Sequence, residues 1–335
     1  MITREHDIIV IGAGALALYA SRVARRKGFS VLRIGAGRPF ERFLLLHENA
    51  LRLLEKHYGT APGHPLVGIK VLDKDLKPLR TVSFAARGLR LHGMRYTALH
   101  ALLRRHDEAE TLATRAAAVS PDATVRLEDG REHRARVMAL NTAGGFTRPR
   151  PRFTHRKVFR MRFLRTDVCT DHVLQINDAG TYAAIVPVGG GEAAVVTSGD
   201  EAPARALVGK AMEAVQAQEL RLQTWCGWKL RQGRLFHIGE AARRVHPHTT
   251  QGLNRALDTI DAIFEGDGLL REKVYDCLMW AAGVGLDLSW GTSPFLRDVT
   301  YRLLDTGWGM KLLSGTAFWR DSATAQPGRQ PSGGA

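Results

Sequence analysis

The segment from Asp7 to Gly35 constrains the fold more than any other part of the chain. Residues 7–12, DIIVIG, are a continuous apolar run ending in glycine, as expected for a parallel strand buried on both faces. ALALYASRVARRKG follows at helical spacing up to Gly28, and FSVLRIG then reads as a second buried strand. This order predicts a Rossmann-like unit of strand, helix and parallel strand at the start of the chain.

The turn between the first strand and the helix reads Gly12-x-Gly14-x-x-Ala17. Such a turn presents backbone N–H groups at a helix N-terminus to a diphosphate. Alanine at the third position is compatible with the pattern, because that residue serves close packing of the helix. The motif in this context therefore predicts dinucleotide binding by Gly12, Gly14, Ala15 and Ala17.

Length and composition indicate a globular protein. The chain has 335 residues and 44% hydrophobic residues, enough for one large domain or two intimate ones. Its three cysteines form no CxxC pair, which indicates a reducing compartment and no metal site. No apolar run approaches the roughly 20 residues that span a bilayer, and the first apolar run follows acidic residues, unlike a secretory signal. We therefore expect a soluble cytoplasmic protein.

The formal charge of +15 favours anionic partners. Phosphate-bearing cofactors, anionic lipid headgroups and nucleic acid all qualify, and a general role in solubility explains the charge equally well. The densest basic block runs from Arg148 to Arg165. Because no helix-turn-helix, zinc-finger or RNP pattern accompanies this block, nucleic acid is the least favoured partner.

The remaining segments predict a mixed α/β chain without repeats. Amphipathic helices are expected at residues 44–59 and 94–106, hairpins at 67–84 and 124–140, a strand-rich middle at 150–235 with one helix at 204–220, and helices from 252 to about 320. The tail at residues 321–335 has the composition of a disordered segment.

The stretch HIGEAARRVHPHTTQGLN, residues 237–254, concentrates polar groups beside a helix start. Glu240 is followed by Arg243 and Arg244, then by a proline-bounded turn and a helix start at Gln251. This arrangement suggests a site for a large, polar and partly anionic ligand.

These landmarks, in this order, resemble the class A flavoprotein monooxygenases of the para-hydroxybenzoate hydroxylase superfamily, and most of all the ubiquinone-biosynthesis hydroxylases. The resemblance rests on the glycine turn, the helix NALRLLEKHYG, the helix start at Arg95-Tyr-Thr-Ala-Leu99, the LEDG hairpin and residues 239–254. In the last stretch the family reads Gly-Asp-Ala-Ala-His, then Pro, then Gly-Gln-Gly-x-Asn. The similarity extends to about residue 320.

The resemblance implies an α/β fold with a Rossmann-like FAD/NAD(P)-binding domain of the glutathione-reductase type, an inserted β-rich substrate domain and a helical C-terminus. The implied FAD-binding domain comprises residues 1–66, 85–148 and 230–270, the substrate domain 67–84 and 149–229, and the C-terminal helices 271–320. A disordered tail at 321–335 would follow.

The resemblance also implies roles for individual residues. The FAD diphosphate would lie on the glycine turn, with Arg95 pairing to the same region of the cofactor. Gly239 and Glu240 would take the place of the Gly-Asp pair that holds ribose or ribityl hydroxyls. The stretch from Pro247 to Asn254, with Gly252 and Leu253, would direct a helix N-terminus toward the pyrimidine edge of the flavin.

The implied activity is that of an oxidoreductase. NAD(P)H would reduce FAD, O₂ would form a C4a-hydroperoxyflavin, and one oxygen atom would pass to an aromatic, quinone-like or polyketide-like substrate. No general base stands out, and His246 and His248 are weak catalytic candidates because a histidine in such a stretch more often has a structural role.

The departures from the family pattern concern the cofactor. Gly35 stands where the family has an acid for the adenosine ribose, Gly144 replaces an aspartate, and Glu240 is one methylene longer than the family's aspartate. The alternative is therefore a flavin-free member of the fold. It would be an enzyme of different chemistry, or a non-catalytic accessory protein that binds a hydrophobic biosynthetic intermediate.

The basic surface and the aromatic residues after Trp290 suggest peripheral contact with an anionic inner membrane or with a biosynthetic complex. Packing of those aromatic side chains in the core is the more ordinary interpretation.

Overall fold

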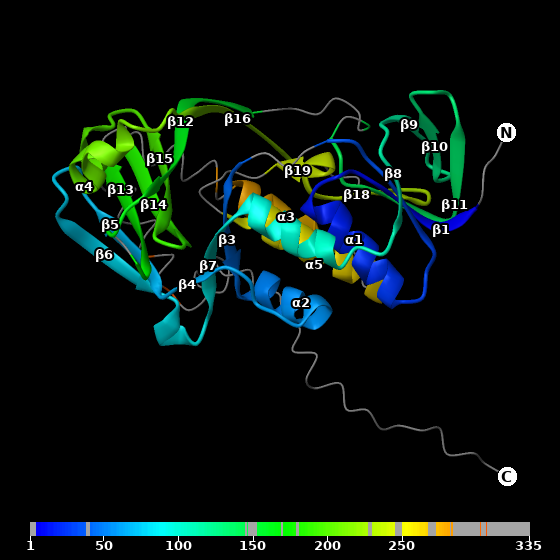
Figure 1. The fold of residues 1–335 in the computed structure, drawn as a ribbon, viewed down its shortest axis with the longest axis horizontal. Helices are drawn as coiled ribbons and strands as arrows, with labels where there is room; N and C mark the ends of the chain where they lie inside the picture. The colour runs from blue at the N-terminus through cyan, green and yellow to red at the C-terminus, as the bar shows by residue number, and fades with distance from the viewer. Residues whose placement is uncertain are drawn as a thin grey trace, which may run out of the picture.

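The computed structural model describes residues 5–37, 41–144, 146, 153–168, 170–178, 181–226, 230–244, 250–266, 273–281, 283, 302 and 306. Figure 1 shows an elongated molecule with one large sheet toward each end of its long axis. Helices pack beside the sheet that contains the N-terminal strand (Figure 1). The structure is therefore a mixed α/β fold, as the sequence predicts.

The first sheet has the strand order β17-β18-β11-β1-β2-β8, with β10 and β9 added to one end of β11. Its strands are β1 (His6–Ile11), β2 (Val31–Ile34), β8 (Glu110–Leu112), β9 (Ala116–Val119), β10 (Thr124–Leu127), β11 (Glu132–Asn141), β17 (Arg231–Gln232) and β18 (Leu235–His237). β1 is parallel to both β2 and β11, and helix α1 (Ala15–Arg26) connects β1 to β2. The predicted order of strand, helix and parallel strand is confirmed.

Alternate side chains of β1 enter two different cores. Ile8 and Val10 pack with the helices, whereas Ile9 and Ile11 pack with the small β-meander of β9 and β10. Because successive side chains of a strand point to opposite faces, an unbroken apolar run is what a strand covered on both sides requires.

Three further helices complete the layer over the first sheet: α2 (Glu48–Tyr58), α3 (Tyr96–Arg105) and α5 (Gln251–Glu265). α1 packs between α3 and α5, and α2 packs on α5 (Figure 1). Gly28 adopts φ +86° directly after α1, so the predicted glycine at that helix end is confirmed.

The second sheet has the order β19-β16-β12-β15-β14-β13-β5-β6. Its strands are β5 (Gly68–Leu72), β6 (Pro78–Ser83), β12 (Phe153–Arg165), β13 (His172–Asp178), β14 (Thr181–Gly189), β15 (Glu192–Ser198), β16 (Gln218–Cys226) and β19 (Arg243–Arg244). All described neighbours in it are antiparallel except β13 and β5. The short helix α4 (Ala202–Val208) covers one face, against Ile176 and Ile185.

A three-stranded sheet, ordered β3-β7-β4, lies between the two large ones (Figure 1). It comprises β3 (Phe43–His47), β4 (His64–Leu66) and β7 (Leu91–Arg95). Leu44 and Leu46 of β3 pack with the helical core, whereas Phe43 and Leu45 face the second sheet. β3 therefore contributes side chains to the cores of both halves of the molecule.

Three of the helices expected from the sequence differ in the structure. The segment 44–59 begins as β3 and becomes helical only at Glu48, because residues 43–47 pair with β7. For the same reason the helix expected from residue 94 begins at Tyr96. The helix expected at 204–220 ends at Val208, is followed by a 3-10 turn (Gly209–Met212), and gives way to β16 at Gln218, which pairs with β12.

Other expectations from the sequence are confirmed or fall outside the described residues. The hairpins at 67–84 and 124–140 form as β5 with β6 and as β10 with β11. Two more 3-10 turns occupy Ala85–Arg87 and Gly239–Ala241. Residues 273–281 are helical, and most of the expected C-terminal helices and the whole tail lie outside the described part.

A buried ionic cluster joins α2 to α5. Asp261 accepts hydrogen bonds from Lys56 at 2.6 Å and contacts Nε2 of His57 at 2.6 Å. Burial opposes the charge of this carboxylate, but the hydrogen bonds and positive charge of His57 and Lys56 outweigh it and lower the Asp261 pKa to about 2. The ionised carboxylate therefore stabilises the folded state.

We expect acid to weaken the protein through Asp261. Its pKa is lower in the folded than in the unfolded chain, so its contribution is complete above about pH 4 and is lost as the pH falls toward 2. Urea denaturation at pH 5 and pH 3 should show a decrease in unfolding free energy that includes about 1 kcal/mol from this residue. Asp261→Asn should shrink the difference, and the exposed control Glu128→Gln should not. An equal pH dependence in wild type and Asp261→Asn would contradict this assignment.

Candidate functional site

The candidate site has two parts that strand β3 connects. One part is the glycine turn between β1 and α1, residues 12–15, called here the glycine loop. The other is an apolar pocket on the face of the second sheet opposite α4. Arg42, immediately before β3, contacts residues beside the glycine loop, and the alternate residues of β3 line the pocket.

The glycines around the loop are packed against the chain itself. A Cβ on Gly12 would lie 2.3 Å from Oγ1 of Thr142, and a Cβ on Gly35 would lie 2.4 Å from the backbone of Gly12. A Cβ on Gly14 would lie 2.8 Å from the hydroxyl of Tyr96. Real Cβ atoms do not approach other atoms this closely, so each glycine is required by a neighbour within the protein.

Helix α3 fixes the glycine loop through two side chains one turn apart. The Tyr96 hydroxyl accepts a 2.9 Å hydrogen bond from the backbone N–H of Ala15, at the start of α1. Nε2 of His100 lies 2.9 Å from the carbonyl oxygen of Ala13 and donates to it. Neither residue is predicted as a site residue from the sequence, although their spacing of four on a helix places both on one face.

Arg42 covers Tyr96 from the other side. Its guanidinium carbon lies 4.4 Å from the centre of the Tyr96 ring, which is 5% exposed. The same guanidinium is 3.6 Å from Oε1 of Glu240, and its backbone carbonyl accepts a 2.7 Å hydrogen bond from the Tyr96 N–H. Glu240, predicted to hold cofactor hydroxyls, thus lies beside the glycine loop as an ion-pair partner of Arg42.

Arg95, the other predicted phosphate ligand, points toward the second sheet. It pairs with Glu192 at 3.1 Å and with Glu41 at 3.2 Å, and its guanidinium carbon lies 4.2 Å from the centre of the Phe163 ring. Because successive side chains at the end of β7 point to opposite sides, Tyr96 rather than Arg95 faces the glycine loop. A role for Arg95 in cofactor binding stays a prediction.

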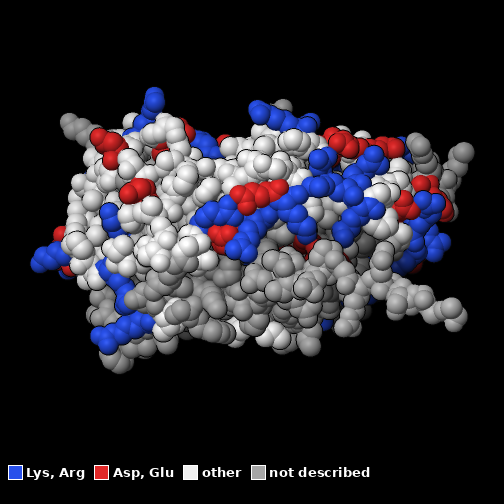
Figure 2. Space-filling view, turned by 90° about the horizontal axis from the view of Figure 1, so that it is seen from below, with Lys and Arg blue, Asp and Glu red and all other residues white. Residues whose placement is uncertain are grey.

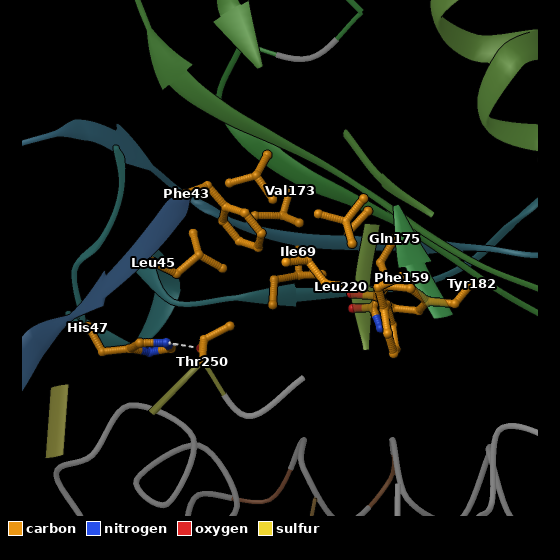
Figure 3. A pocket seen from close by; sticks show the side chains of 13 residues that line it. Phe43, Leu45, His47, Ile69, Phe159, Val173, Gln175, Tyr182, Leu220 and Thr250 are labelled. Carbon is orange, nitrogen blue, oxygen red and sulfur yellow. Dashed lines mark hydrogen bonds between the residues drawn. The ribbon is translucent and has the colours of Figure 1, made fainter. Parts of the chain in front are cut away.

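The pocket contains about 740 Å³ of empty space, part of which is open to solvent. Figure 3 shows side chains from β3 and from strands of the second sheet, β5 among them, converging on the pocket. Its lining comprises Phe43, Leu45, His47, Ile69, Phe159, Val173, Gln175, Tyr182, Ala184, Val186, Val196, Leu220 and Thr250. No charged side chain occurs in this lining, within the part of the chain that the structure describes.

His47 and Thr250 form a polar pair in the pocket wall, with Nε2 of His47 2.5 Å from Oγ1 of Thr250 (Figure 3). Burial lowers the His47 pKa to about 3, so the ring is neutral at neutral pH. Thr250 adopts φ +51°, a left-handed conformation that is strained for a β-branched residue. The end of β3 and the start of α5 therefore present a neutral hydrogen-bonding pair to a mostly apolar cavity.

Asn254 fixes this helix start to β3. Its side-chain amide donates to the carbonyls of Leu45 at 2.9 Å and Thr250 at 2.7 Å, and its oxygen accepts from the N–H of His47 at 3.1 Å. Asn254, predicted as a cofactor ligand, is buried and its amide makes these contacts within the chain.

The remaining predicted residues of this stretch have different surroundings. Gly252 is exposed in the first turn of α5, and Leu253 packs at the edge of the helical core. Gly239 adopts φ +59° against Leu16 of α1. The weak catalytic candidates His246 and His248, together with Pro247, lie outside the described residues.

The arginines that suggested an anion site in the sequence have structural contacts. Arg243 is 3% exposed, forms an ion pair with Asp276, and donates to the hydroxyl of Thr259 at 3.1 Å. Arg244 stacks over Trp225 with its guanidinium carbon 5.7 Å from the ring centre. Arg243 therefore anchors α5 to the helical segment at residues 273–281.

These residues fit one end of an FAD molecule better than the other. The pocket and the start of α5 offer space and neutral hydrogen-bonding groups for a flat ring system. At the nucleotide end, the Ala15 N–H is taken by Tyr96, and Gly35 leaves no space for an acid to hold the ribose. The nucleotide half of FAD does not fit the loop in this conformation.

Among the described residues, no group of His, Cys, Asp or Glu side chains is arranged to hold a metal ion. None of the helices in the same part of the chain has the length and apolarity needed to cross a bilayer.

No model of a protein family matches the chain, and no curated protein does. Among solved structures, PqsL of Pseudomonas aeruginosa, a probable FAD-dependent monooxygenase, is similar with a TM-score of 0.73 and 20% identity over 90% of this chain and 100% of its own. The 2-methyl-3-hydroxypyridine-5-carboxylic acid oxygenase gives 0.73 and 16% over 93% and 96%. The p-nitrophenol 4-monooxygenase PnpA of Pseudomonas putida DLL-E4 gives 0.75 and 14% over 95% and 97%. Because the sequence identities are this low, the similarities show that the chain shares the fold of these proteins and nothing more.

We expect Asn254→Ala to destabilise the protein by about 2–4 kcal/mol, because three backbone groups, two of them in buried hydrogen bonds, lose the Asn254 side chain. Urea denaturation of the variant against wild type measures the loss. Gln216→Ala, at an exposed position, is the control and should change the unfolding free energy little. A variant as stable as wild type would show that Asn254 does not hold β3 and α5 together.

Proposed function

We propose that the protein is a flavin-dependent monooxygenase that oxygenates a neutral, hydrophobic substrate, aromatic or quinone-like, in the pocket between β3 and the second sheet. NAD(P)H is the proposed source of electrons. When bound, the flavin would supply the oxygen-activating chemistry, and the chain would hold the substrate and exclude water. Kinship with the ubiquinone-biosynthesis hydroxylases is part of the same proposal.

The observation that carries the proposal is the pocket. Its walls are apolar and aromatic, with a few neutral polar groups at Gln175, Tyr182 and the pair of His47 and Thr250. Such lining selects flat, uncharged molecules that form one or two hydrogen bonds. Its neutral walls would also leave a substrate carboxylate unpaired, at a high desolvation cost.

The shared fold supports the reaction class. PqsL has been crystallised with 2-aminobenzoylacetate, and PnpA acts on p-nitrophenol, so two proteins of this fold bind small aromatic molecules. For this chain we propose that the flavin ring binds between the start of α5 and the pocket, with Gly252 and Leu253 nearby. Catalytic roles for His246 and His248 stay predictions.

The side chains packed against the glycine loop favour a second function. Because Tyr96 and Thr142 fill the spaces beside Gly14 and Gly12, the chain also suits a flavin-free protein that binds a hydrophobic intermediate in the same pocket. Such a protein would be an accessory member of a biosynthetic complex or an enzyme of different chemistry.

Flavin titration distinguishes the two functions. We expect added FAD to develop the visible spectrum of protein-bound flavin, and hydrophobic phenols to stimulate NAD(P)H oxidation by the complex. A protein that binds 1-naphthol but whose spectrum does not respond to saturating FAD would reject the monooxygenase and leave the accessory role.

Filling the pocket should weaken ligand binding. Ala184 lies on the pocket face of β14, and Ala184→Phe should weaken 1-naphthol binding about tenfold or more by occupying the cavity. Val137→Phe adds the same ring at an exposed strand position and should not. Equilibrium dialysis gives the affinities, and thermal melts verify folding.

Wild type should also prefer 1-naphthol to 1-naphthoate, and the reverse preference would contradict a neutral pocket.

Contact with an anionic membrane is a separate proposal. Figure 2 shows a face on which Lys and Arg side chains form a band interleaved with acidic ones. Among the described cations, Arg90 is neutralised by Glu48 and Glu55, whereas Arg25 and Arg105 are exposed at helix ends. Sedimentation with anionic liposomes should be salt-sensitive if the membrane is a partner, and equal sedimentation with neutral liposomes would reject it.

A further inference from the structure

We infer that Tyr96 takes the place of a phosphate at the start of α1 and thereby keeps the affinity of this protein for flavin dinucleotides low. The inference rests on the proposed flavin site in that it concerns the same cofactor. It goes beyond that site by assigning the control of cofactor affinity to one residue.

The position of the hydroxyl carries the inference. It lies 2.9 Å from the Ala15 nitrogen and 2.8 Å from where a Cβ of Gly14 would lie. A glycine loop binds a diphosphate because its missing side chains leave room for close approach and its N–H groups point outward. Here one phenol oxygen fills that room and accepts the hydrogen bond of the amide.

Arg42 holds the tyrosine in this position through two contacts. Its backbone N–H donates to the Arg42 carbonyl at 2.7 Å, and the Arg42 guanidinium lies 4.4 Å above its ring. Glu240 holds that guanidinium at 3.6 Å. One turn along α3, His100 holds the carbonyl of Ala13, so the loop cannot easily move away from the hydroxyl.

A phosphate would have to displace this arrangement. Moving the ring would remove it from the stack with Arg42 and leave a buried hydroxyl to find another partner. The charge-assisted hydrogen bond gained by the phosphate would be offset by these losses. A flavin without phosphates would not meet this competition, because its binding does not require the Ala15 amide.

The substitution Tyr96→Phe tests the inference. It keeps the ring and its stack with Arg42, removes only the hydroxyl, and leaves the Ala15 N–H available for a phosphate oxygen. We expect the Kd of the full-length protein for FAD and for ADP to decrease about tenfold, the effect of one hydrogen bond to a charged group, with no change for riboflavin. Equilibrium dialysis and calorimetry measure the three affinities.

Tyr58→Phe is the matched control. Tyr58 lies at the end of α2, packs against Tyr19, and has a buried hydroxyl remote in sequence from the glycine loop. This variant should leave the affinities for FAD, ADP and riboflavin at wild-type values. Circular dichroism and thermal melts show whether each variant is folded, and Tyr96→Leu provides a second variant without the hydroxyl.

The outcomes separate this inference from the proposed function. Tighter FAD and ADP binding by Tyr96→Phe supports the inference, including when wild type binds neither ligand detectably. If the variant gains ADP affinity but neither protein binds riboflavin, the inference stands and the flavin site is rejected. Unchanged affinities, or no binding of FAD and ADP by either protein, overturn it, and weaker binding by the variant would make Tyr96 a cofactor ligand.

Discussion

The close approach of backbone at the carboxyl ends of β1 and β2 governs the candidate site. Gly35 packs so closely on the backbone of Gly12 that a side chain at Gly35 would clash with it, and Thr142 from the end of β11 excludes a side chain at Gly12. This contact fixes the path by which the chain enters α1. Because the three strands are parallel neighbours, all three residues meet at one edge of the sheet.

Strand β3 connects the glycine loop to the pocket. Its alternate side chains enter the helical core on one side and the pocket on the other, so a shift of one residue would exchange the two sets. Asn254, at the start of α5, opposes such a shift because its side chain forms hydrogen bonds to two backbone groups of β3. The pocket, the helix start and the glycine loop are therefore positioned by one strand and its partners.

Part of this organisation was predictable from sequence because it depends on near neighbours in the chain. The buried run before Gly12, the helix ending before Gly28 and the two hairpins each follow from local pattern. Residues 44–47 form a strand where the sequence predicts the start of a helix, because an apolar run of three leucines suits a strand or a helix equally, and only pairing with β7 decides between them. The helix expected at 204–220 was lost to strand pairing in the same way.

Local sequence pattern predicts that this chain opens with strand, glycine turn, helix and strand, and it shows glycine at positions 35 and 144, where the family that the sequence resembles has acids. What surrounds that turn depends on tertiary packing. It brings Tyr96 and not Arg95 onto the Ala15 amide, buries Arg243 with Asp276, and assembles the neutral pair of His47 and Thr250 from residues far apart in the chain. Local pattern fixes backbone form over a few residues, whereas side-chain partners depend on which elements pack together.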